Sequence, residues 1–430
     1  MTEPKNKKIK NICMLSTHGY FDPVPELGKT DTGGQVLYVL QLAQAITRFG
    51  INVDIYTRWF DPAKPQIEPI PGCSKARVIR IPAGKWEFIR KESIYGILDE
   101  LAENMIKFIK EQKLEYDLFH GHYVDAGIVT LKVAKALSKP SFFTAHSLGA
   151  WKRERVSGNP KEMDKIFNFT YRITQELRIF QSVNGQTITS KEEEEKMKEL
   201  YHFQPANLEF TPPGVDVNKF RPLKKNEKEE NTEIILPNKY IFVVSRISKA
   251  KAHDLLLPAF KQILKEFPDI HLVIAGGAPN PDQEEIEVLS NIKSFVKQNQ
   301  IEKNVLLIGG IAHDNLPPYF RKAELFILPA RYEPFGMTAL EAMACKIPAV
   351  ISKFSGIQEN LIHGQDCLIV NPYETQNYAK SISILLRDRR MRQHLAKKGY
   401  LTVRDKFSWE AIAKRFINFY TKIIHKINIH

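Results

Sequence analysis

Short apolar runs alternate with amphipathic stretches along most of the chain. In the first half, five apolar runs predict buried strands at residues 12–15, 53–56, 78–81, 118–119 and 142–144. In the second half, five more predict strands at residues 240–244, 272–275, 305–308, 325–328 and 349–351. Strands that alternate with helices form parallel sheets covered by helices on both faces. The pattern therefore predicts an α/β protein with two Rossmann-like halves.

A charged segment separates the two halves. Residues 222–238 include a run of lysines, glutamates and asparagines at 224–232 that offers almost nothing to bury. We therefore predict an N-terminal domain over 1–222 and a C-terminal domain over 236–408. The closing stretch, about 409–430, has apolar residues at helical spacing and is predicted to be a helix that joins the first domain. Because open parallel sheets bind ligands beyond the carboxyl ends of their strands, we expect the substrates in a cleft between the halves.

Composition limits the class of protein without choosing one. With 430 residues and 43% hydrophobic content, the chain can bury the cores of two or three domains. No apolar stretch approaches the roughly 20 residues of a membrane helix, and no signal core follows the lysine-rich N-terminus, so we expect a cytoplasmic protein. The four scattered cysteines lack the spacing of zinc or redox sites. A net charge of +13 suits nucleic acid, anionic membranes or small phosphorylated ligands.

Two cations follow the first strand of the second half. Arg246 and Lys251 lie five residues apart in one loop. A guanidinium fork and a mobile ammonium can together hold a diphosphate and stabilise it as a leaving group. From these residues alone, an ordinary basic loop is an equally good interpretation.

Two glutamates follow the predicted strand at 325–328. Glu333 lies in a turn that contains proline and glycine, and Glu341 lies about one turn into a helix that begins near Met337. Both carboxylates can reach one ligand, accepting hydrogen bonds from sugar hydroxyls while the free amides of the helix start meet anionic groups. Solvated surface glutamates are the weaker alternative.

The first half carries its own candidate residues. Gly33, Gly34 and Gln35 open an apolar-periodic helix, where paired glycines let a ligand approach the backbone and the first amides favour an anion. Another segment with candidate chemistry, 146–149, follows a strand and begins with a histidine. Three cations in this half are candidate phosphate ligands if the fold brings them together, although each alone is more simply a solvated surface charge: Lys91, Lys152 and Arg172.

The spacing of Glu333 and Glu341, with seven residues between them and Arg246 and Lys251 upstream, resembles the donor site of the retaining GT-B glycosyltransferases. The resemblance implies that Glu333 contacts the transferred sugar, that Glu341 contacts the ribose hydroxyls, and that Arg246 and Lys251 hold the diphosphate. It also places four neighbouring residues in the donor site: Phe335, Gly336, Met337 and Thr338.

Segments of the first half are similar to the sucrose-phosphate synthase and mannosylfructose-phosphate synthase group. They are 18–38, 91–92, 122–127, 146–152 and 167–173, so that the resemblance covers nearly the whole chain. It implies that Gly33, Gly34 and Gln35 line the acceptor sugar and that Lys91, Ser147, Lys152 and Arg172 bind its phosphate. His146 would lie beside the donor hexose, and the catalytic set would be His146, Arg246, Lys251 and Glu333.

The implied activity is retaining transfer of a hexose from UDP-glucose or GDP-mannose to fructose 6-phosphate, with no metal and no cofactor. No Asp-X-Asp motif is present, and the donor stays open between the two nucleotide sugars. One departure from the relatives is Lys346, where they carry glycine; a left-handed backbone there would cost of order 1 kcal/mol.

Several alternatives stay open. The acceptor could be another sugar or a lipid; a phosphorylase-like enzyme would need pyridoxal phosphate; and a basic nucleic-acid or membrane-surface protein would fit the net charge. We expect no nucleic-acid partner and no integral membrane segment. A separate sugar phosphatase is a candidate partner, and the sequence leaves the oligomeric state open.

Overall fold

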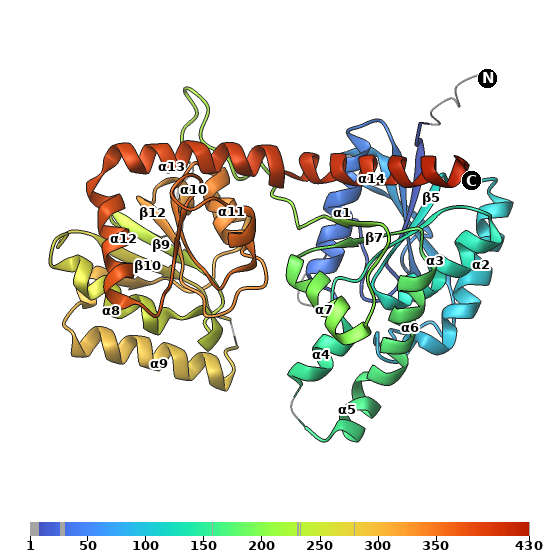
Figure 1. The fold of residues 1–430 in the computed structure, drawn as a ribbon, viewed down its shortest axis with the longest axis horizontal. Helices are drawn as coiled ribbons and strands as arrows, with labels where there is room; N and C mark the ends of the chain where they lie inside the picture. Colours follow the sequence, from blue (N-terminus) through green and yellow to red (C-terminus); the bar gives the residue numbers. More distant parts are fainter. Residues whose placement is uncertain are drawn as a thin grey trace. The chain divides into compact units, whose positions relative to one another are not determined.

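The computed structural model describes residues 8–25, 31–156, 158–229, 232, 234–278 and 280–429. The chain forms two compact units, shown in Figure 1: the first comprises residues up to Gly214 together with those from Trp409 onward, and the second comprises Val215–Ser408. The change of unit precedes the charged segment at 222–238, because residues just before that segment already pack with the second unit. For example, the ring of Phe220 lies 6.0 Å from that of Phe320.

The first unit is built on an eight-stranded sheet with the order β3-β4-β2-β1-β5-β6-β7-β8. Its strands are β1 Asn11–Leu15, β2 Asn52–Trp59, β3 Ile67–Ile70, β4 Cys73–Pro82, β5 Leu118–His122, β6 Ser141–Thr144, β7 Gly185–Ile188 and β8 Leu208–Phe210. Every neighbouring pair is parallel except the antiparallel pair of β3 and β4. The prediction of a parallel sheet is thus correct for the body of the sheet and wrong at this edge.

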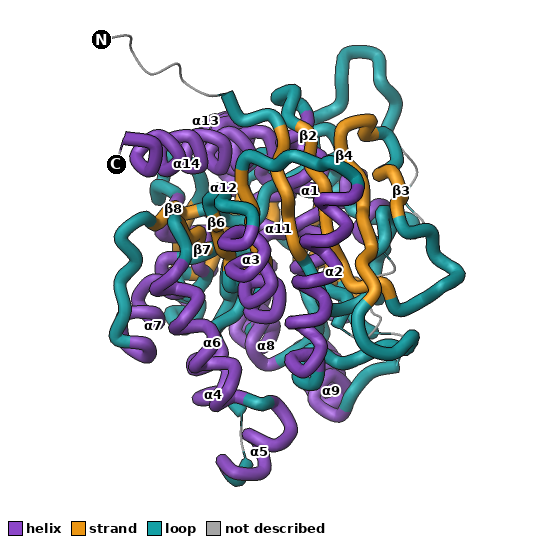
Figure 2. Tube along the Cα trace, turned by 90° about the vertical axis from the view of Figure 1, so that its right-hand side faces the viewer, coloured by secondary structure: helices purple, strands orange, loops and turns teal. Residues whose placement is uncertain are grey.

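Helices cover both faces of this sheet. They are α1 Gly34–Thr47, α2 Leu98–Glu111, α3 Val124–Ala136, α4 Gly149–Arg155, α5 Pro160–Phe167, α6 Phe169–Ser182, α7 Lys191–Tyr201 and α14 Trp409–Ile429, with a 3-10 turn η1 at Ile94–Ile97. Because side chains alternate along a strand, Ile12 and Met14 of β1 pack into one core with α1 and α14, whereas Cys13 and Leu15 pack into the other. Figure 2 shows helices flanking the strands of this unit. The predicted closing helix is therefore α14, which packs beside α1.

The second unit has a six-stranded sheet with the order β11-β10-β9-β12-β13-β14, in which every neighbouring pair is parallel. Its strands are β9 Tyr240–Val244, β10 His271–Ala275, β11 Val305–Leu307, β12 Leu325–Leu328, β13 Ala349–Ser352 and β14 Leu368–Val370. Its helices are α8 His253–Leu264, α9 Gln283–Gln298, α10 Pro317–Arg321, α11 Met337–Ala344, α12 Thr375–Arg387 and α13 Arg389–Thr402. Shorter turns are η2 Lys249–Lys251, η3 Glu302–Asn304, η4 His313–Asn315, η5 Gly356–Asn360 and the π-helical turn η6 Val403–Phe407.

In both sheets the strand order reverses at the first strand of the unit. The chain runs outward from β9 to β10 and β11, then returns to place β12 on the other side of β9. In the first unit, β1 likewise lies between β2 and β5. Ligands of open α/β sheets bind beyond the carboxyl ends of the strands at such a reversal. The loops after β1, β5, β9 and β12 are therefore the places where substrates are expected.

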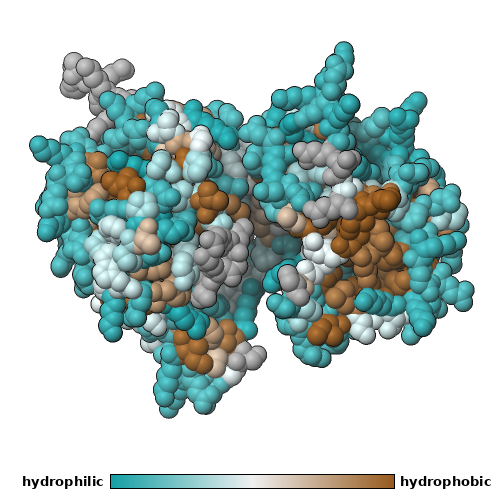
Figure 3. Space-filling view, turned by 180° about the vertical axis from the view of Figure 1, so that it is seen from behind, coloured by the Kyte–Doolittle hydropathy of each residue, from teal (hydrophilic) through white to brown (hydrophobic). Residues whose placement is uncertain are grey.

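No helix in the part of the chain that the structure describes is long and apolar enough to cross a membrane. On the face shown in Figure 3, hydrophilic residues predominate and apolar residues form separate patches. All four cysteines are free.

The backbone at Lys346 is left-handed, with φ at 65°. We therefore expect Lys346→Gly to stabilise the second unit by up to about 1 kcal/mol, because glycine adopts this conformation without a clash at Cβ. Differential scanning calorimetry would measure the change in melting temperature.

A matched variant, Lys346→Ala, removes the same charged side chain but keeps Cβ, and should give no such gain. All four tryptophans, at 59, 86, 151 and 409, belong to the first unit, so the unfolding transition seen by their fluorescence serves as an internal control. Equal stability of the glycine and alanine variants would contradict the backbone explanation.

Candidate active site

In the second unit, the predicted cation and carboxylate form a direct ion pair. Lys251, buried at the end of η2, contacts the carboxylate of Glu333, which follows β12. The two loops are tied together by the backbone N–H of Arg331, which donates to the carbonyl of Ala250 at 2.8 Å. The structure thus brings together two residues that are 82 positions apart in the sequence.

The loop that carries Glu333 is also held from the side of β13. The backbone N–H of Glu333 donates to the carbonyl of Phe354 at 3.1 Å, and the N–H of Gly356 donates to the carbonyl of Glu333 at 2.9 Å. A Cβ at Gly356 would lie only 2.1 Å from the carbonyl oxygen of Pro334, so only glycine fits there. Glu333 is therefore fixed between the loops that follow β9 and β13.

Glu341 lies buried in α11 with one oxygen paired and one unpaired. Its Oε1 lies 2.7 Å from Nε2 of His313 in η4. Its Oε2 is buried and has no hydrogen-bond partner among the described residues, so it can accept a hydrogen bond from a ligand hydroxyl. Sequence reasoning missed His313, because no motif marks the segment between β11 and α10.

The start of α11 has the geometry of an anion-facing turn. Gly336 precedes the helix with φ at 113°, and a Cβ there would lie 3.0 Å from the side chain of Ile357. The first amides of a helix, here those of Met337 and Thr338, have no acceptor within the helix. Phe335 is buried, with its ring 6.4 Å from that of Phe407. The four predicted donor-site residues at 335–338 thus divide into one packing residue, one turn residue and two with amides at the helix start.

Arg246 differs from Lys251 in its surroundings. It is exposed, and its guanidinium forms no hydrogen bond or ion pair with any residue that the structure describes. Arg246 therefore offers an unpaired charge to an anionic ligand, whereas Lys251 is already paired with Glu333.

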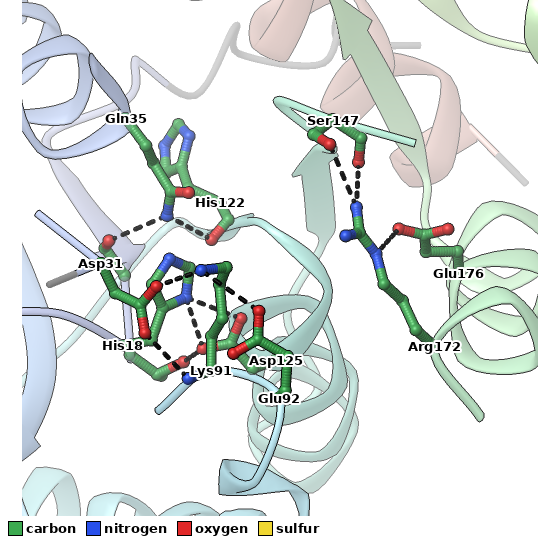
Figure 4. Close-up of polar contacts among 12 residues, drawn as sticks. His18, Asp31, Gln35, Lys91, Glu92, His122, Asp125, Ser147, Arg172 and Glu176 are labelled. Atoms are coloured by element: carbon green, nitrogen blue, oxygen red, sulfur yellow. Dashed lines mark hydrogen bonds and ion pairs between the residues drawn. The ribbon is translucent and has the colours of Figure 1, made fainter. Parts of the chain in front are cut away.

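In the first unit, the glycine pair at the start of α1 has open space on the side of the described residues. A Cβ at Gly33 or Gly34 would have no neighbour within 4 Å among them, so packing against these residues does not require glycine there. Next to the pair, Nε2 of Gln35 donates to Oγ of Ser16 at 3.2 Å and to the carbonyl of His122 at 3.1 Å (Figure 4). The open glycines and the fixed glutamine amide leave room for a ligand at this helix start.

Lys91 is neutralised by two carboxylates, as Figure 4 shows. Its ammonium contacts Asp31 and lies 3.4 Å from Oε1 of Glu92, and its backbone N–H donates to Asp31 at 3.1 Å. Burial raises the pKa of Asp31, but the hydrogen bonds and charge of Lys91 outweigh it and hold that pKa below its usual range. The resemblance implies Lys91 as a phosphate ligand; the structure adds that a phosphate would have to compete with Asp31 and Glu92 for it.

Arg172 lies buried and organises the turn before α4. It is 3% exposed, and its Nε donates to Glu176 at 2.8 Å while Nη2 donates to the carbonyl of Ser147 at 2.6 Å. Glu176 also accepts from the backbone N–H of Gly149 at 2.9 Å. Figure 4 shows Ser147, Arg172 and Glu176 as one group. The structure thus joins two predicted phosphate ligands, Ser147 and Arg172, by hydrogen bonds, while the ion pair with Glu176 holds Arg172 in place.

Lys152 is the cation of this group that lacks a carboxylate partner among the described residues. It is half-buried, with its ammonium 4.7 Å from the ring centroid of Phe167. Burial lowers the pKa of Lys152, and the positive charges of Arg172 and Lys91 lower it further. Arg172 and Lys91 therefore lie near enough to repel the charge of Lys152, although Glu92 and Asp31 partly offset their effect on its pKa.

A group of buried histidines surrounds His146. Nε2 of His146, whose φ is 58°, lies 2.9 Å from Nδ1 of His122, and the ring of His122 stacks on that of His120. Burial, and then the charge of His18, lowers the pKa of His146 to about 3. Burial, and then His146, lowers the pKa of His120 to about 3, and burial with both neighbouring histidines puts the pKa of His122 well below its usual range. All three rings are therefore neutral near pH 7.

Only His146 of this trio was singled out from the sequence. His120 and His122 lie two apart on β5, so that both side chains point to the same face of the sheet. That spacing could have identified His120 and His122 from the sequence as two histidines on one face of a strand.

These three histidines make stability depend on pH. Their pKa values in the folded state lie below the usual 6.5, so the unfolded chain binds protons that the folded chain does not. We expect the first unit to be most stable above pH 6.5 and to lose about 1.4 kcal/mol per pH unit for each histidine as the pH falls towards 3.

Tryptophan fluorescence, which reports the first unit, would give the free energy of unfolding at pH 7.5, 6.5 and 5.5. His120→Asn should lower stability at pH 7.5 but make its dependence on pH shallower. A free energy that stays constant or rises on acidification would show that the three rings are protonated in the folded protein.

Two Rossmann-like units, with cations and carboxylates gathered where their strand orders reverse, define a glycosyltransferase of the GT-B class. Comparison with known proteins supports this: residues 224–402 match the family model of the group 1 glycosyl transferases, and residues 32–219 match that of glycosyltransferase family 4. The chain therefore belongs to the group 1 glycosyltransferases and has their GT-B fold.

Individual relatives cover nearly the whole chain. Mannosylfructose-phosphate synthase of Agrobacterium fabrum is 33% identical over 97% of this chain and 92% of its own length. D-inositol 3-phosphate glycosyltransferase of Corynebacterium glutamicum is 26% identical over 97% of this chain and 98% of its own. The solved structure of sucrose-phosphate synthase from Thermosynechococcus elongatus superposes with a TM-score of 0.70 at 27% identity, covering 97% of this chain and 100% of that one. The predicted fold and enzyme class are confirmed.

Proposed function

We propose that the chain transfers a hexose from a nucleotide sugar, UDP-glucose or GDP-mannose, to fructose 6-phosphate with retention of the anomeric configuration. The observation that carries this proposal is the turn before α4, where Arg172 donates to the carbonyl of Ser147 at 2.6 Å and where Lys152, in α4, has no carboxylate partner among the described residues. The names of the three relatives above all include a phosphate-bearing sugar or inositol. A dianionic phosphate is the ligand that such a group of cations favours.

The acceptor's phosphate meets Lys152 first in this proposal, because Lys152 alone of the three cations has no carboxylate partner among the described residues. Arg172 holds Ser147 in place, so that the hydroxyl of Ser147 can bind the phosphate. Lys91 also binds the phosphate, while it shares its charge with Asp31. Gly33, Gly34 and Gln35 then line the sugar ring of the acceptor.

The donor's diphosphate lies against Arg246 and Lys251 in this proposal, with the amides of Met337 and Thr338 at the start of α11. Glu333 accepts hydrogen bonds from hydroxyls of the transferred hexose, and the unpaired Oε2 of Glu341 accepts one from the ribose. The ion pair of Lys251 and Glu333 fits these two roles, because it joins the residue that binds the diphosphate to the residue that binds the sugar.

The reaction then needs few acid–base groups from the protein. The bond between the anomeric carbon and the diphosphate oxygen breaks, and the acceptor hydroxyl forms its bond to the same face of that carbon. Its proton passes to the departing diphosphate. Arg246 and Lys251 stabilise the charge that develops on the leaving group, and His146 contacts the transferred hexose.

A phosphorylated inositol is a second candidate acceptor. The similarity to a D-inositol 3-phosphate glycosyltransferase covers 97% of the chain and favours it specifically. Both candidates require the same phosphate ligands, so they differ in what Gly33, Gly34 and Gln35 contact.

The role of Glu333 is testable by an isosteric change. Glu333→Gln should lower kcat at least about 100-fold, because a neutral amide neither balances Lys251 nor accepts two sugar hydrogen bonds. Steady-state release of nucleoside diphosphate would measure the loss, with circular dichroism as a check on the fold.

Glu324→Gln is a suitable control in the same unit, since Glu324 pairs with Arg392 at 3.3 Å outside the candidate site. Wild-type turnover by the Glu333 variant would refute the assigned role.

The phosphate site is testable at Lys152. Lys152→Ala should raise KM for fructose 6-phosphate about tenfold to 100-fold while changing KM for the donor little, because one charge-assisted hydrogen bond to phosphate is lost. Initial rates with each substrate varied in turn would separate the two effects.

Arg153→Ala is the matched control, because Arg153 is the next residue of α4 and is exposed. Equal changes in both KM values for the Lys152 variant would place the acceptor phosphate elsewhere.

A further inference from the structure

His146 makes its closest polar contact with another histidine rather than with a charged group. Its Nε2 lies 2.9 Å from Nδ1 of His122, which ends β5. Only one nitrogen of His146, Nδ1, therefore remains for a substrate. Whether that nitrogen donates or accepts depends on which ring supplies the proton in the contact with His122.

His122 is held rigidly. It is fully buried, and its ring stacks on His120 at 4.4 Å between centroids with an angle of 10° between the planes. His120 is fixed in turn by contacts at 2.6 Å with the hydroxyl of Tyr420 and at 2.8 Å with Oγ1 of Thr144. The ring of His122 has no freedom to turn away from His146.

The unpaired nitrogen of His122 decides between two arrangements. Nε2 of His122 is buried and has no hydrogen-bond partner among the described residues. If His146 donated to Nδ1 of His122, the neutral ring of His122 would carry its proton on this buried Nε2. If His122 donates instead, Nε2 is a bare acceptor. Buried N–H groups without a partner are rarer than under-satisfied acceptors, which favours donation by His122.

We propose that His122 is a positioning residue that donates its Nδ1–H to Nε2 of His146 and so keeps the proton of His146 on Nδ1, facing the substrate. His146 then presents an N–H donor to a hydroxyl oxygen of the transferred hexose. The catalytic consequence rests on the proposed function, whereas the proton arrangement does not.

A neutral donor suits the chemistry better than a charged one. As the bond to the leaving group breaks, the sugar ring gains oxocarbenium character and positive charge. A protonated imidazole beside it would repel that charge, and a ring with a bare Nδ1 could only accept a hydrogen bond. Donation from His122 gives His146 its donor without adding charge.

The same residue also holds an acceptor-site group. The backbone carbonyl of His122 accepts a hydrogen bond from Nε2 of Gln35 at 3.1 Å, which Figure 4 shows. His122 thus contacts one proposed acceptor ligand through its backbone and the proposed hexose ligand through its ring. Any residue would supply the backbone carbonyl, so it is the ring contact with His146 that accounts for a buried histidine, rather than an apolar residue, at the end of β5.

The proton arrangement is measurable without turnover. In the full-length protein labelled with ¹⁵N-histidine, NMR at pH 7.5 should show His146 with Nδ1 protonated and Nε2 bare, and His122 likewise. Signals are assigned by their loss in His122→Asn and His146→Asn. A His146 ring protonated on Nε2, or on both nitrogens, would overturn the proposal.

Two variants test the consequence for catalysis. In His122→Asn, the side-chain amide nitrogen replaces Nδ1 as a donor, whereas His122→Leu removes the donor. We expect kcat to fall about tenfold in the leucine variant, the value of one hydrogen bond, with KM for the acceptor little changed and most activity recovered in the asparagine variant.

If His122 has only a structural role, kcat should fall equally in both variants and the His146 tautomer should stay unchanged in both. That result would overturn the proposal. If the transferase assignment itself is wrong, neither the wild type nor the variants transfer a hexose from the nucleotide sugar to fructose 6-phosphate. The NMR measurement would still show which nitrogen of His146 carries the proton.

Discussion

The pairing of cations with carboxylates is the interaction on which both halves of the candidate site depend. Arg172 pairs with Glu176 within α6, whereas Lys91 with Asp31 and Lys251 with Glu333 join residues 60 and 82 positions apart in the sequence. A buried charge is costly unless it is paired, so a cation held at a site without a bound anion needs a partner within the protein. The carboxylates therefore keep the cations in place, and under the proposed function the substrates' anions would compete with or share these partners.

Because of this constraint, substitutions of the different cations would have different effects. Arg172 and Glu176 are both almost fully buried, and breaking such a pair costs about 3–5 kcal/mol because the remaining charge is left uncompensated. A substitution of Arg172 would therefore disturb the fold around Ser147 and Gly149 before it revealed anything about phosphate. Lys152 and Arg246 lack carboxylate partners among the described residues, so their removal reports on ligand binding more directly.

Much of the framework was predictable because neighbouring residues in the sequence determine where a strand ends and which turn follows it. The apolar runs located the strands that carry the site, and the turn at Glu333 with the helix start at Met337 was visible from proline, glycine and helix-forming residues. The edge strand β3 was not, since it is short, half-exposed and contains Pro69. Nor were β7, β8 and β14, which have three or four residues each.

Partners that lie far from the site residues in the sequence could not be predicted. Lys91 and Asp31 are 60 residues apart, and His122 and His146 meet only because β5 and β6 are neighbours in the sheet. Sequence spacing names the candidate ligands, but strand order decides which charges neutralise one another. For that reason, Lys91 looked like a free cation in the sequence and is ion-paired with Asp31 in the structure. The pair of Arg172 and Glu176 is different: the two residues are four apart on one helix, so the sequence carried a local signal for it.

The most direct measurement of the central claim is product formation from fructose 6-phosphate with UDP-glucose and, separately, with GDP-mannose, using unphosphorylated fructose as the control acceptor. Chromatography that resolves the disaccharide phosphate from free nucleoside diphosphate would detect transfer rather than hydrolysis. The account predicts a disaccharide phosphate with one of the two donors, NMR of the product showing the anomeric configuration of that donor, and far slower reaction with fructose. Reaction that is equally fast with fructose, or no transfer to fructose 6-phosphate from either donor, would contradict it.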